Sequence, residues 1–305
     1  MTRFAHRRLL FASLIAASSA LLWQQASAAT LDRVKETKKL TLGYRSDAPP
    51  MSFDEAGKPG GYSVALCQLI ADQMKADLSL PDLNVQWTPV TLDDRFTALK
   101  EGKIDLLCGA SSVTLARRKD VSFSIPIFPS GIGALLRTDA PLALRLILST
   151  GQPPSEPVWR GSPARTVLEK RTYSVVTKTT AESWLPERIK AFEVDASIAP
   201  VASYDAGVQS VLSRSSDVLF GDRAILLGAA KRSTSSEDLV VLDRYFTYEP
   251  VALALPRDDE DLRLFVDRKL SQTFGSADFP SIYGKYFGAP DAAAAEFFQL
   301  TALPE

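Results

Sequence analysis

The sequence predicts an α/β protein built as two lobes, and three observations support this. Strands alternate with helices from Lys38 onward, and the alternation resumes after an irregular stretch rich in proline, glycine and serine. Such alternation is typical of parallel sheets that are covered by helices on both faces. The chain of 305 residues is long enough for two lobes, and after the amino terminus no apolar run approaches the ~20 residues of a membrane helix.

The amino terminus has the features of a secretory signal peptide, which we expect at residues 1–28. Arg3, Arg7 and Arg8 precede an apolar run, and Ala26-Ser27-Ala28 offers a cleavage site. Arg7-Arg8 also permits a twin-arginine interpretation, which the flanking residues fit poorly. Because no cysteine lies near the cleavage point, we expect an exported protein without a lipid anchor.

The elements of the first half follow from local patterns. Apolar runs predict strands at 38–45, 83–90, 104–110, 122–128 and 131–137. Helical spacing of apolar residues predicts a helix at 61–76, and Gly102 closes a shorter helix that begins at Asp93. Thr114 is a good N-cap, so a further helix is expected to start with Leu115 to Lys119.

The second half repeats the alternation after residues 138–171, which we interpret as a connection or insertion with two short helices at about 142–148 and 163–170. Strands are expected at 172–177, 192–201, 217–222 and 249–256, and helices at 180–192, 204–213, 223–231 and 258–273. An aromatic segment follows at 279–290. The tail at 291–305 is expected to pack on one lobe, or to present "FFQL" at 297–300 as a docking patch.

Charge and rare residues exclude several functions. Without the three signal-peptide arginines the chain has 32 basic and 36 acidic residues, a net charge of about −4, which argues against nucleic acid as a partner. The single histidine, His6, lies in the signal peptide, so Ser-His-Asp catalysis, Cys-His catalysis and histidine-based metal sites are excluded. We expect no metal and no cofactor. Cys67 and Cys108 either form a disulfide or remain buried thiols.

The stretch "GASSVTLARRKDVSFSIP" at 109–126 combines small residues, hydroxyls and arginines. Arg117 would lie beside free backbone N–H groups at a helix start, where a carboxylate can bind. The alternative is a solvated helix end. Arg45, the 109–112 loop and Arg117 all follow predicted strands, at the edge of a parallel sheet where ligands bind.

Several segments together resemble the type 2 periplasmic solute-binding proteins of polar amino acid ABC transporters, in the glutamate/aspartate-binding branch. The matching segments are "LGYRSDAPPMSF", "VTLDDRFTALKEGKIDLLCGASSVTLARRKDVSFSIPIF", "TKTTAESWL", "VLFGDRAILLGAAK" and "FTYEPVALALP". The resemblance implies two Rossmann-like lobes joined by two crossover strands. Residues 29–137 plus 248–290 would form lobe 1, residues 138–247 would form lobe 2 with the insertion at 138–171, and residues 291–305 would form a tail.

The resemblance also implies the binding residues. Arg117 would pair with the ligand α-carboxylate and Ser112 would join it, while Asp222 would take the ammonium group. Asp222 also fits an N-cap of the next helix, and the two roles are compatible. Thr179 and Thr180 match hydroxyl residues that contact the carboxylate, although helix capping explains them equally well.

Two further arginines match positions that hold the distal carboxylate in these relatives. They are Arg45, and Arg95 at the start of a helix. The alternative for Arg95 is a surface residue held in salt bridges by Asp93 and Asp94. Three cationic forks suit a ligand with two carboxylates, because a neutral ligand would leave a buried charge unpaired at a cost of roughly 3–5 kcal/mol.

Five positions depart from the glutamate/aspartate-binding pattern. Leu92 replaces a hydroxyl residue, Ala110 a serine, Lys178 a glycine and Tyr204 a histidine near the distal carboxylate, and Arg223 replaces an acid beside Asp222 and would add a cation at the mouth of the site. These changes leave room for a larger or partly apolar carboxylate. Trp159 and Arg160 in the insertion would serve packing, or touch a ligand or partner.

We therefore expect a periplasmic, monomeric binding protein that captures an acidic amino acid by lobe closure and passes it to an ABC transporter membrane permease. An alternative is an enzyme on the same fold, like the periplasmic cyclohexadienyl dehydratases that act on prephenate or arogenate. The lack of histidine and of a second placed acid argues against it. A further alternative is a sensory module that acts through a separate receptor.

Overall fold

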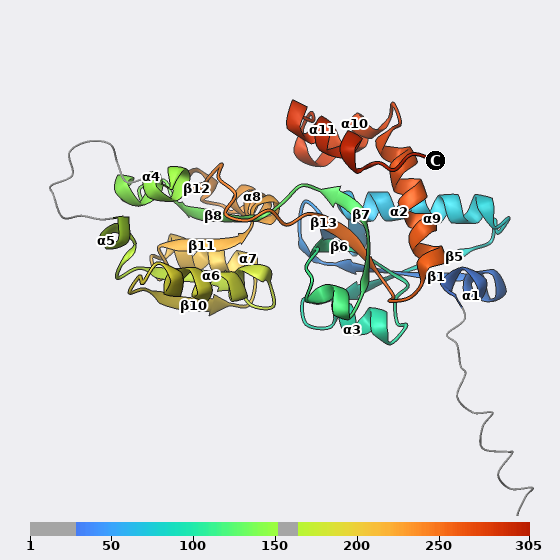
Figure 1. Cartoon of the computed structure of the whole chain (residues 1–305), viewed down its shortest axis with the longest axis horizontal. Coiled ribbons are helices and arrows are strands. Elements are labelled where there is room, and N and C mark those ends of the chain that lie inside the picture. The colour runs from blue at the N-terminus through green and yellow to red at the C-terminus, as the bar shows by residue number, and fades with distance from the viewer. Residues whose placement is uncertain (1–28, 152–163) are drawn as a thin grey trace, which may run out of the picture.

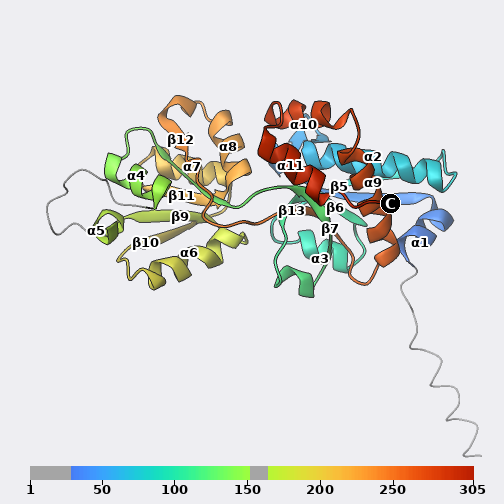
Figure 2. The same cartoon turned by 45° about the horizontal axis from the view of Figure 1, so that its top comes forward.

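The computed structural model describes residues 29–151 and 164–305. Two α/β lobes lie side by side along the long axis of the molecule, and each is built on a five-stranded sheet (Figures 1 and 2). Within these residues no helix has the length and apolar character to cross a membrane. The predicted signal peptide, Trp159 and Arg160 lie outside the described residues.

Lobe 1 contains the amino-terminal elements and the last strand of the chain. Its helices and strands are α1 (Thr30–Thr37), β1 (Lys39–Arg45), β2 (Asp47–Ala48), β3 (Ser52–Glu55), β4 (Lys58–Gly60), α2 (Tyr62–Asp77), β5 (Asn84–Val90), α3 (Arg95–Lys100), β6 (Leu106–Ser112), η1 (Arg117–Lys119), β7 (Ser122–Phe128) and β13 (Val251–Leu255). The sheet order is β5-β1-β6-β13-β7. Strand β1 is parallel to β5 and β6, and β13 lies antiparallel between β6 and β7.

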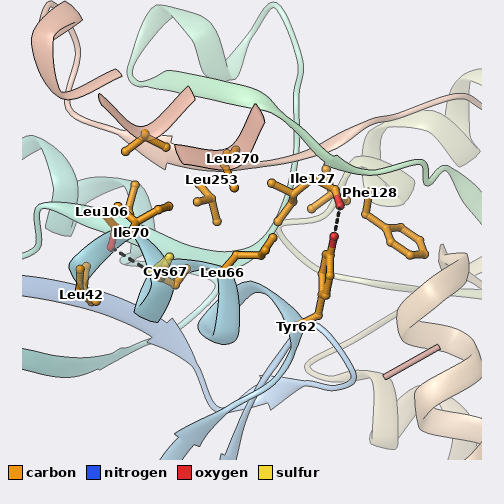
Figure 3. Close-up of a cluster of buried hydrophobic side chains, with 14 of the residues drawn as sticks. Leu42, Tyr62, Leu66, Cys67, Ile70, Leu106, Ile127, Phe128, Leu253 and Leu270 are labelled. Carbon is orange, nitrogen blue, oxygen red and sulfur yellow. Dashed lines mark hydrogen bonds between the residues drawn. A yellow bond between two sulfur atoms is a disulfide. The ribbon is translucent and has the colours of Figure 1, made fainter. Parts of the chain in front are cut away.

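The core of lobe 1 lies between the sheet and α2. Gly61 precedes α2 with φ of 118°, and a Cβ there would lie 2.4 Å from the Met51 carbonyl oxygen, so the turn requires glycine. The apolar face of α2 packs against the central strands (Figure 3). Cys67 of α2 and Cys108 of β6 form a disulfide with Cα atoms 6.1 Å apart, which decides the question that the sequence left open.

Lobe 2 contains the middle of the chain. Its elements are β8 (Ile132–Arg137), α4 (Leu142–Thr150), α5 (Ala164–Leu168), β9 (Thr172–Val176), α6 (Thr180–Ala191), β10 (Ser197–Val201), α7 (Tyr204–Leu212), β11 (Val218–Asp222), α8 (Arg223–Arg232), η2 (Ser236–Asp238) and β12 (Leu239–Val241). The sheet order is β10-β9-β11-β8-β12, with β8 antiparallel to both of its neighbours. Strand β8 thus belongs to the sheet of lobe 2, so the expected boundary at residue 137 is too late.

Two crossovers connect the lobes, one between β7 and β8 and one at 242–250 (Figure 1). They contact each other directly. The Glu249 N–H donates to the Ser130 carbonyl at 2.7 Å, and the Ile132 N–H donates to Thr247 Oγ1 at 2.9 Å. This contact joins the outgoing and returning segments into one connection.

The chain ends with α9 (Glu260–Phe274), α10 (Phe279–Phe287) and α11 (Ala292–Thr301), which cover lobe 1. Phe298 of α11 is buried in an aromatic cluster with Phe274, Phe279 and Tyr283. The tail therefore packs on lobe 1. Of the apolar residues expected for a docking patch, only Leu300 is strongly exposed, at 78%.

Candidate functional site

Three arginines follow the strands of lobe 1 and face the same region between the lobes. Arg45 ends β1, Arg95 begins α3 after β5, and Arg117 begins η1 after β6. They lie within electrostatic reach of one another, because Arg117 and Arg45 both lower the pKa of Arg95. We call these three arginines and the residues that face them from lobe 2 and the crossovers the inter-lobe site.

Among the described residues, Arg95 is the one of the three whose side chain has a hydrogen bond to the opposite lobe. Its side chain is buried, and Nη2 donates across the lobes to the Lys178 carbonyl oxygen at 3.1 Å. Burial, with the charges of Arg117 and Arg45, lowers the pKa of Arg95 to about 9. The alternative of a surface residue is therefore wrong, and Asp94 instead accepts a hydrogen bond from the Thr91 N–H.

Arg45 is buried and already has a carboxylate partner. Its Nε donates to Asp47 Oδ1 at 2.8 Å, and Nη2 lies 2.7 Å from the same oxygen. The Nη2 group is nevertheless a buried donor without a properly directed hydrogen bond to any described residue. Asp47, which was not identified from the sequence, thus offsets the charge of Arg45, and the Nη2 group retains donor capacity for a ligand.

Arg117 is held from both its backbone and its side chain. Its N–H donates to Thr114 Oγ1 at 3.1 Å, and Nη1 donates to the Ser112 carbonyl at 2.8 Å. The capping by Thr114 is confirmed, but the expected helix is wrong, because η1 is a single turn of three residues. Any attraction for a carboxylate therefore comes from the guanidinium group. Burial lowers the pKa of this group.

Phe96 supports two of these guanidinium groups. The Cζ atom of Arg95 lies 4.4 Å from the centre of the Phe96 ring, and that of Arg117 lies 5.5 Å from it. Cation–π contacts at these distances restrain both side chains. In the sequence, an aromatic residue next to Arg95 on a short helix is the signal that could have identified this contact.

Thr179 and Thr180 open α6 but do not cap it as expected. Thr179 Oγ1 donates to the Val176 carbonyl at 2.7 Å, and Thr180 Oγ1 donates to Glu249 Oε2 at 2.5 Å. Their contact with a ligand carboxylate stays a prediction. Lys178, just before them, has φ of 61°, a conformation that glycine adopts more easily.

Asp222 and Tyr204 face the arginines from lobe 2. Asp222 Oδ1 accepts from the N–H groups of Ala224 and Ile225 at 3.0 and 3.3 Å, which confirms that it caps α8. Ser130 Oγ donates to Oδ2 at 2.8 Å, and burial raises the pKa of Asp222 to about 6. The buried Tyr204 hydroxyl accepts from the Asp222 N–H at 3.2 Å. The ammonium-binding role of Asp222 stays a prediction.

Apolar contacts hold the lobes together beside these polar groups. Ala48, Leu92 and Ala110 of lobe 1 belong to or pack against an apolar cluster that includes Tyr204 and Leu226 of lobe 2. The backbones also approach closely, because a Cβ on Gly228 of α8 would lie 2.3 Å from the Pro49 carbonyl oxygen. The structure therefore shows the lobes in a closed arrangement.

Arg223 does not add a cation to the site, contrary to expectation. Its Nη2 donates to Asp243 at 2.7 Å, and its Nε donates to the Leu242 carbonyl at 2.8 Å. The side chain therefore points toward the returning crossover.

Glu249 is the second carboxylate that the sequence analysis missed. It lies in the returning crossover, accepts from Thr180 and Thr247, and raises the pKa of both Arg117 and Asp222. No local sequence signal identifies it, because its partners come from both lobes.

Two α/β lobes, a double crossover and a charged site between the lobes define a two-lobed solute-binding protein. The chain matches the bacterial extracellular solute-binding proteins, family 3, over residues 40–289, and it belongs to that family.

Two relatives with similar sequences are both named as binding proteins for glutamate and aspartate. The L-glutamate/L-aspartate-binding protein of Pseudomonas aeruginosa is 27% identical over 267 residues, 86% of this chain and 80% of the relative. The glutamate/aspartate import solute-binding protein of Escherichia coli K12 is 24% identical over 268 residues, 87% of this chain and 82% of the relative.

Solved structures agree with the fold. The cysteine-binding protein of Campylobacter jejuni has a TM-score of 0.69 at 20% identity, with 88% of this chain and 98% of that chain covered. An ancestral amino acid-binding protein, described as a precursor of cyclohexadienyl dehydratase, has a TM-score of 0.67 at 24% identity, with 85% and 100% covered. These similarities support the fold alone.

Proposed function

We propose that this protein is the binding component of an ABC importer for polar, acidic L-amino acids. The observation that carries the proposal is the convergence of Arg45, Arg95 and Arg117 in the inter-lobe site, where Arg95 is buried without a paired carboxylate among the described residues. A ligand with two carboxylates would offset these charges. The curated relatives named for glutamate and aspartate support the same ligand class.

Each residue has a role in this proposal. Arg117 and Ser112 bind the α-carboxylate, with Thr179 and Thr180 beside it, and Asp222 binds the ammonium group. Arg95 and Arg45 bind the distal carboxylate. Tyr204 and Ala110 contact the ligand where relatives have more polar residues. Because Asp47 already pairs with Arg45, the distal carboxylate relies first on Arg95 and then on the remaining N–H groups of Arg45.

Ligand binding acts by favouring the closed lobes. Closure brings the Lys178 carbonyl to Arg95 and excludes water, which strengthens the charge-assisted hydrogen bonds. The closed form is the one that the permease would recognise. The affinity of the ligand for that form therefore sets the fraction of the protein that is closed. We further propose that the mature protein is a periplasmic monomer that begins after residue 28.

The test is a thermal-shift screen of ligand-free protein against amino acids, dicarboxylates and prephenate. Ligand at a hundred times its dissociation constant should add about 2.7 kcal/mol to the free energy of unfolding. Arg117→Ala should abolish the shift by glutamate or aspartate, whereas Arg118→Ala, an exposed neighbour, should preserve it. Equal shifts for both variants would refute the assignment of Arg117.

A second candidate is an enzyme of the dehydratase type. The observation in its favour is the pKa of Asp222, about 6, because such a carboxyl group can donate a proton near neutral pH. The structural neighbour described as a dehydratase precursor belongs to the same fold. Product formation from prephenate would establish this function, and binding without turnover would reject it.

A further inference from the structure

Glu249 lies where the two crossovers meet, and the proposed function gives it no role. Its N–H donates to the Ser130 carbonyl, and the Ser130 hydroxyl donates to Asp222. Glu249 and Asp222 are therefore linked through one residue of the outgoing crossover. The backbone that carries Glu249 is fixed by the same contacts that join the lobes.

Hydroxyl groups from two segments orient the Glu249 carboxylate. Thr180 of α6 donates to Oε2 at 2.5 Å, and Thr247 donates to Oε1 at 2.8 Å. Each carboxylate oxygen has more than one lone pair, so both oxygens retain acceptor capacity after these bonds. The side chain is only partly buried, and no lysine or arginine forms an ion pair with it among the described residues.

The inter-lobe site consequently has a basic end and an acidic end. Arg45, Arg95 and Arg117 form the basic end, and Asp222 and Glu249 form the acidic end. Glu249 interacts electrostatically with both Arg117 and Asp222, so its charge lies at the junction of the two ends. Asp222 already accepts three hydrogen bonds, which use part of its acceptor capacity, so a second carboxylate nearby would strengthen the binding of a cation.

We propose that Glu249 binds the ligand's ammonium group together with Asp222 and thereby selects α-amino acids over carboxylates that lack an amine. This inference rests on the proposed function and names the chemical class that the site accepts. A carboxylate bound to Arg117 without a neighbouring ammonium group would meet the negative charge of Glu249 uncompensated. A zwitterion places its own cation between the two carboxylates.

The test compares L-glutamate with glutarate, which has the same carbon chain and no amine, by isothermal titration calorimetry at pH 7.5. Glu249→Gln removes the charge and keeps an oxygen that can accept from Thr180. We expect glutamate affinity to fall on the order of 10- to 100-fold and glutarate affinity to stay unchanged or rise. The matched control is Thr247→Val, which removes the other hydroxyl contact of Glu249 without changing its charge and should preserve most of the preference for glutamate.

Equal weakening of both compounds by Glu249→Gln would show that Glu249 only holds the lobes together, and it would overturn the inference. An unchanged preference for glutamate would overturn it as well. If the wild-type protein binds another amino acid, the comparison uses that amino acid and its deaminated analogue, with the same expected result. If it binds no amino acid at all, the proposed function fails and this assignment fails with it. Thermal denaturation without ligand confirms that each variant is folded.

Discussion

Gly228→Ala tests whether the closed arrangement is the state that binds ligand. A Cβ at this position would lie 2.3 Å from the Pro49 carbonyl oxygen and 3.1 Å from Pro50 Cδ, both on the opposite lobe. Overpacking of this kind costs about 1–3 kcal/mol. Because the lobes can relieve the contact by opening, the cost falls on the closed state, and affinity for glutamate should fall about 5- to 150-fold.

The stability of the separate lobes should not suffer from this change. Gly228 lies inside α8, where alanine favours the helix by up to ~1 kcal/mol over glycine. The matched control is Gly284→Ala inside α10, because a Cβ there has no atom within 4 Å. Calorimetry should show weaker binding only for Gly228→Ala, while chemical denaturation without ligand shows no loss for either variant. Wild-type affinity in Gly228→Ala would refute the closed arrangement as the binding state.

Four further predictions concern charge and the disulfide. Asp222 has a pKa of about 6, above the value of 3.8 expected for an unfolded chain, so ligand-free stability should fall as pH rises from about 4 to 6. Ammonium binding needs the ionised form, so calorimetric affinity for an amino acid should be about tenfold lower at pH 5 than at pH 7, and a flat profile would argue against this role. Arg95→Met should weaken glutamate binding. In urea denaturation without ligand, it should raise the free energy of unfolding by about 1–4 kcal/mol, because the burial of the Arg95 charge is unfavourable. A loss of stability would contradict this reasoning. Replacing Cys67 and Cys108 by alanine should lower the free energy of unfolding by about 4 kcal/mol for a sequence separation of 41, and an unchanged denaturation midpoint would contradict it.

Local sequence patterns predicted most of the fold. Alternating apolar runs located the main strands, and the short helices expected inside the insertion correspond to α4 and α5. The sheet that β8 joins could not be predicted, because an apolar strand does not specify its partner in the fold. The helix expected after Thr114 is also wrong, because the surrounding fold limits its length. The capping signal is real, but the Val121 N–H donates to the Arg117 carbonyl and β7 begins at the next residue, so the turn has no room to extend.

The site was predictable where a motif carried it. Arg45, Arg95, Arg117 and Asp222 were identified as candidates from the resemblance. The structure places the three arginines within electrostatic reach of one another, and Asp222 bonds to Tyr204, which interacts with Arg45. Their contact with a ligand stays a prediction. Glu249 was not identified, because it meets Thr180 at a separation of 69 residues and only the crossover geometry joins them. Asp47 was missed although it lies two residues after Arg45, because residues i and i+2 of an extended chain can share a face without any motif that marks the pair.

The position of β13 bears on the order in which the two sheets can assemble. A chain synthesised from its amino end presents β8 to β12 well before β13. The sheet of lobe 2 has all its strands once residue 241 has emerged. The sheet of lobe 1 must wait for residues 251–255, because β13 is the strand that attaches β7 to β6. Non-local pairing of this kind folds slowly. The lobe that begins first during synthesis is thus the lobe completed last.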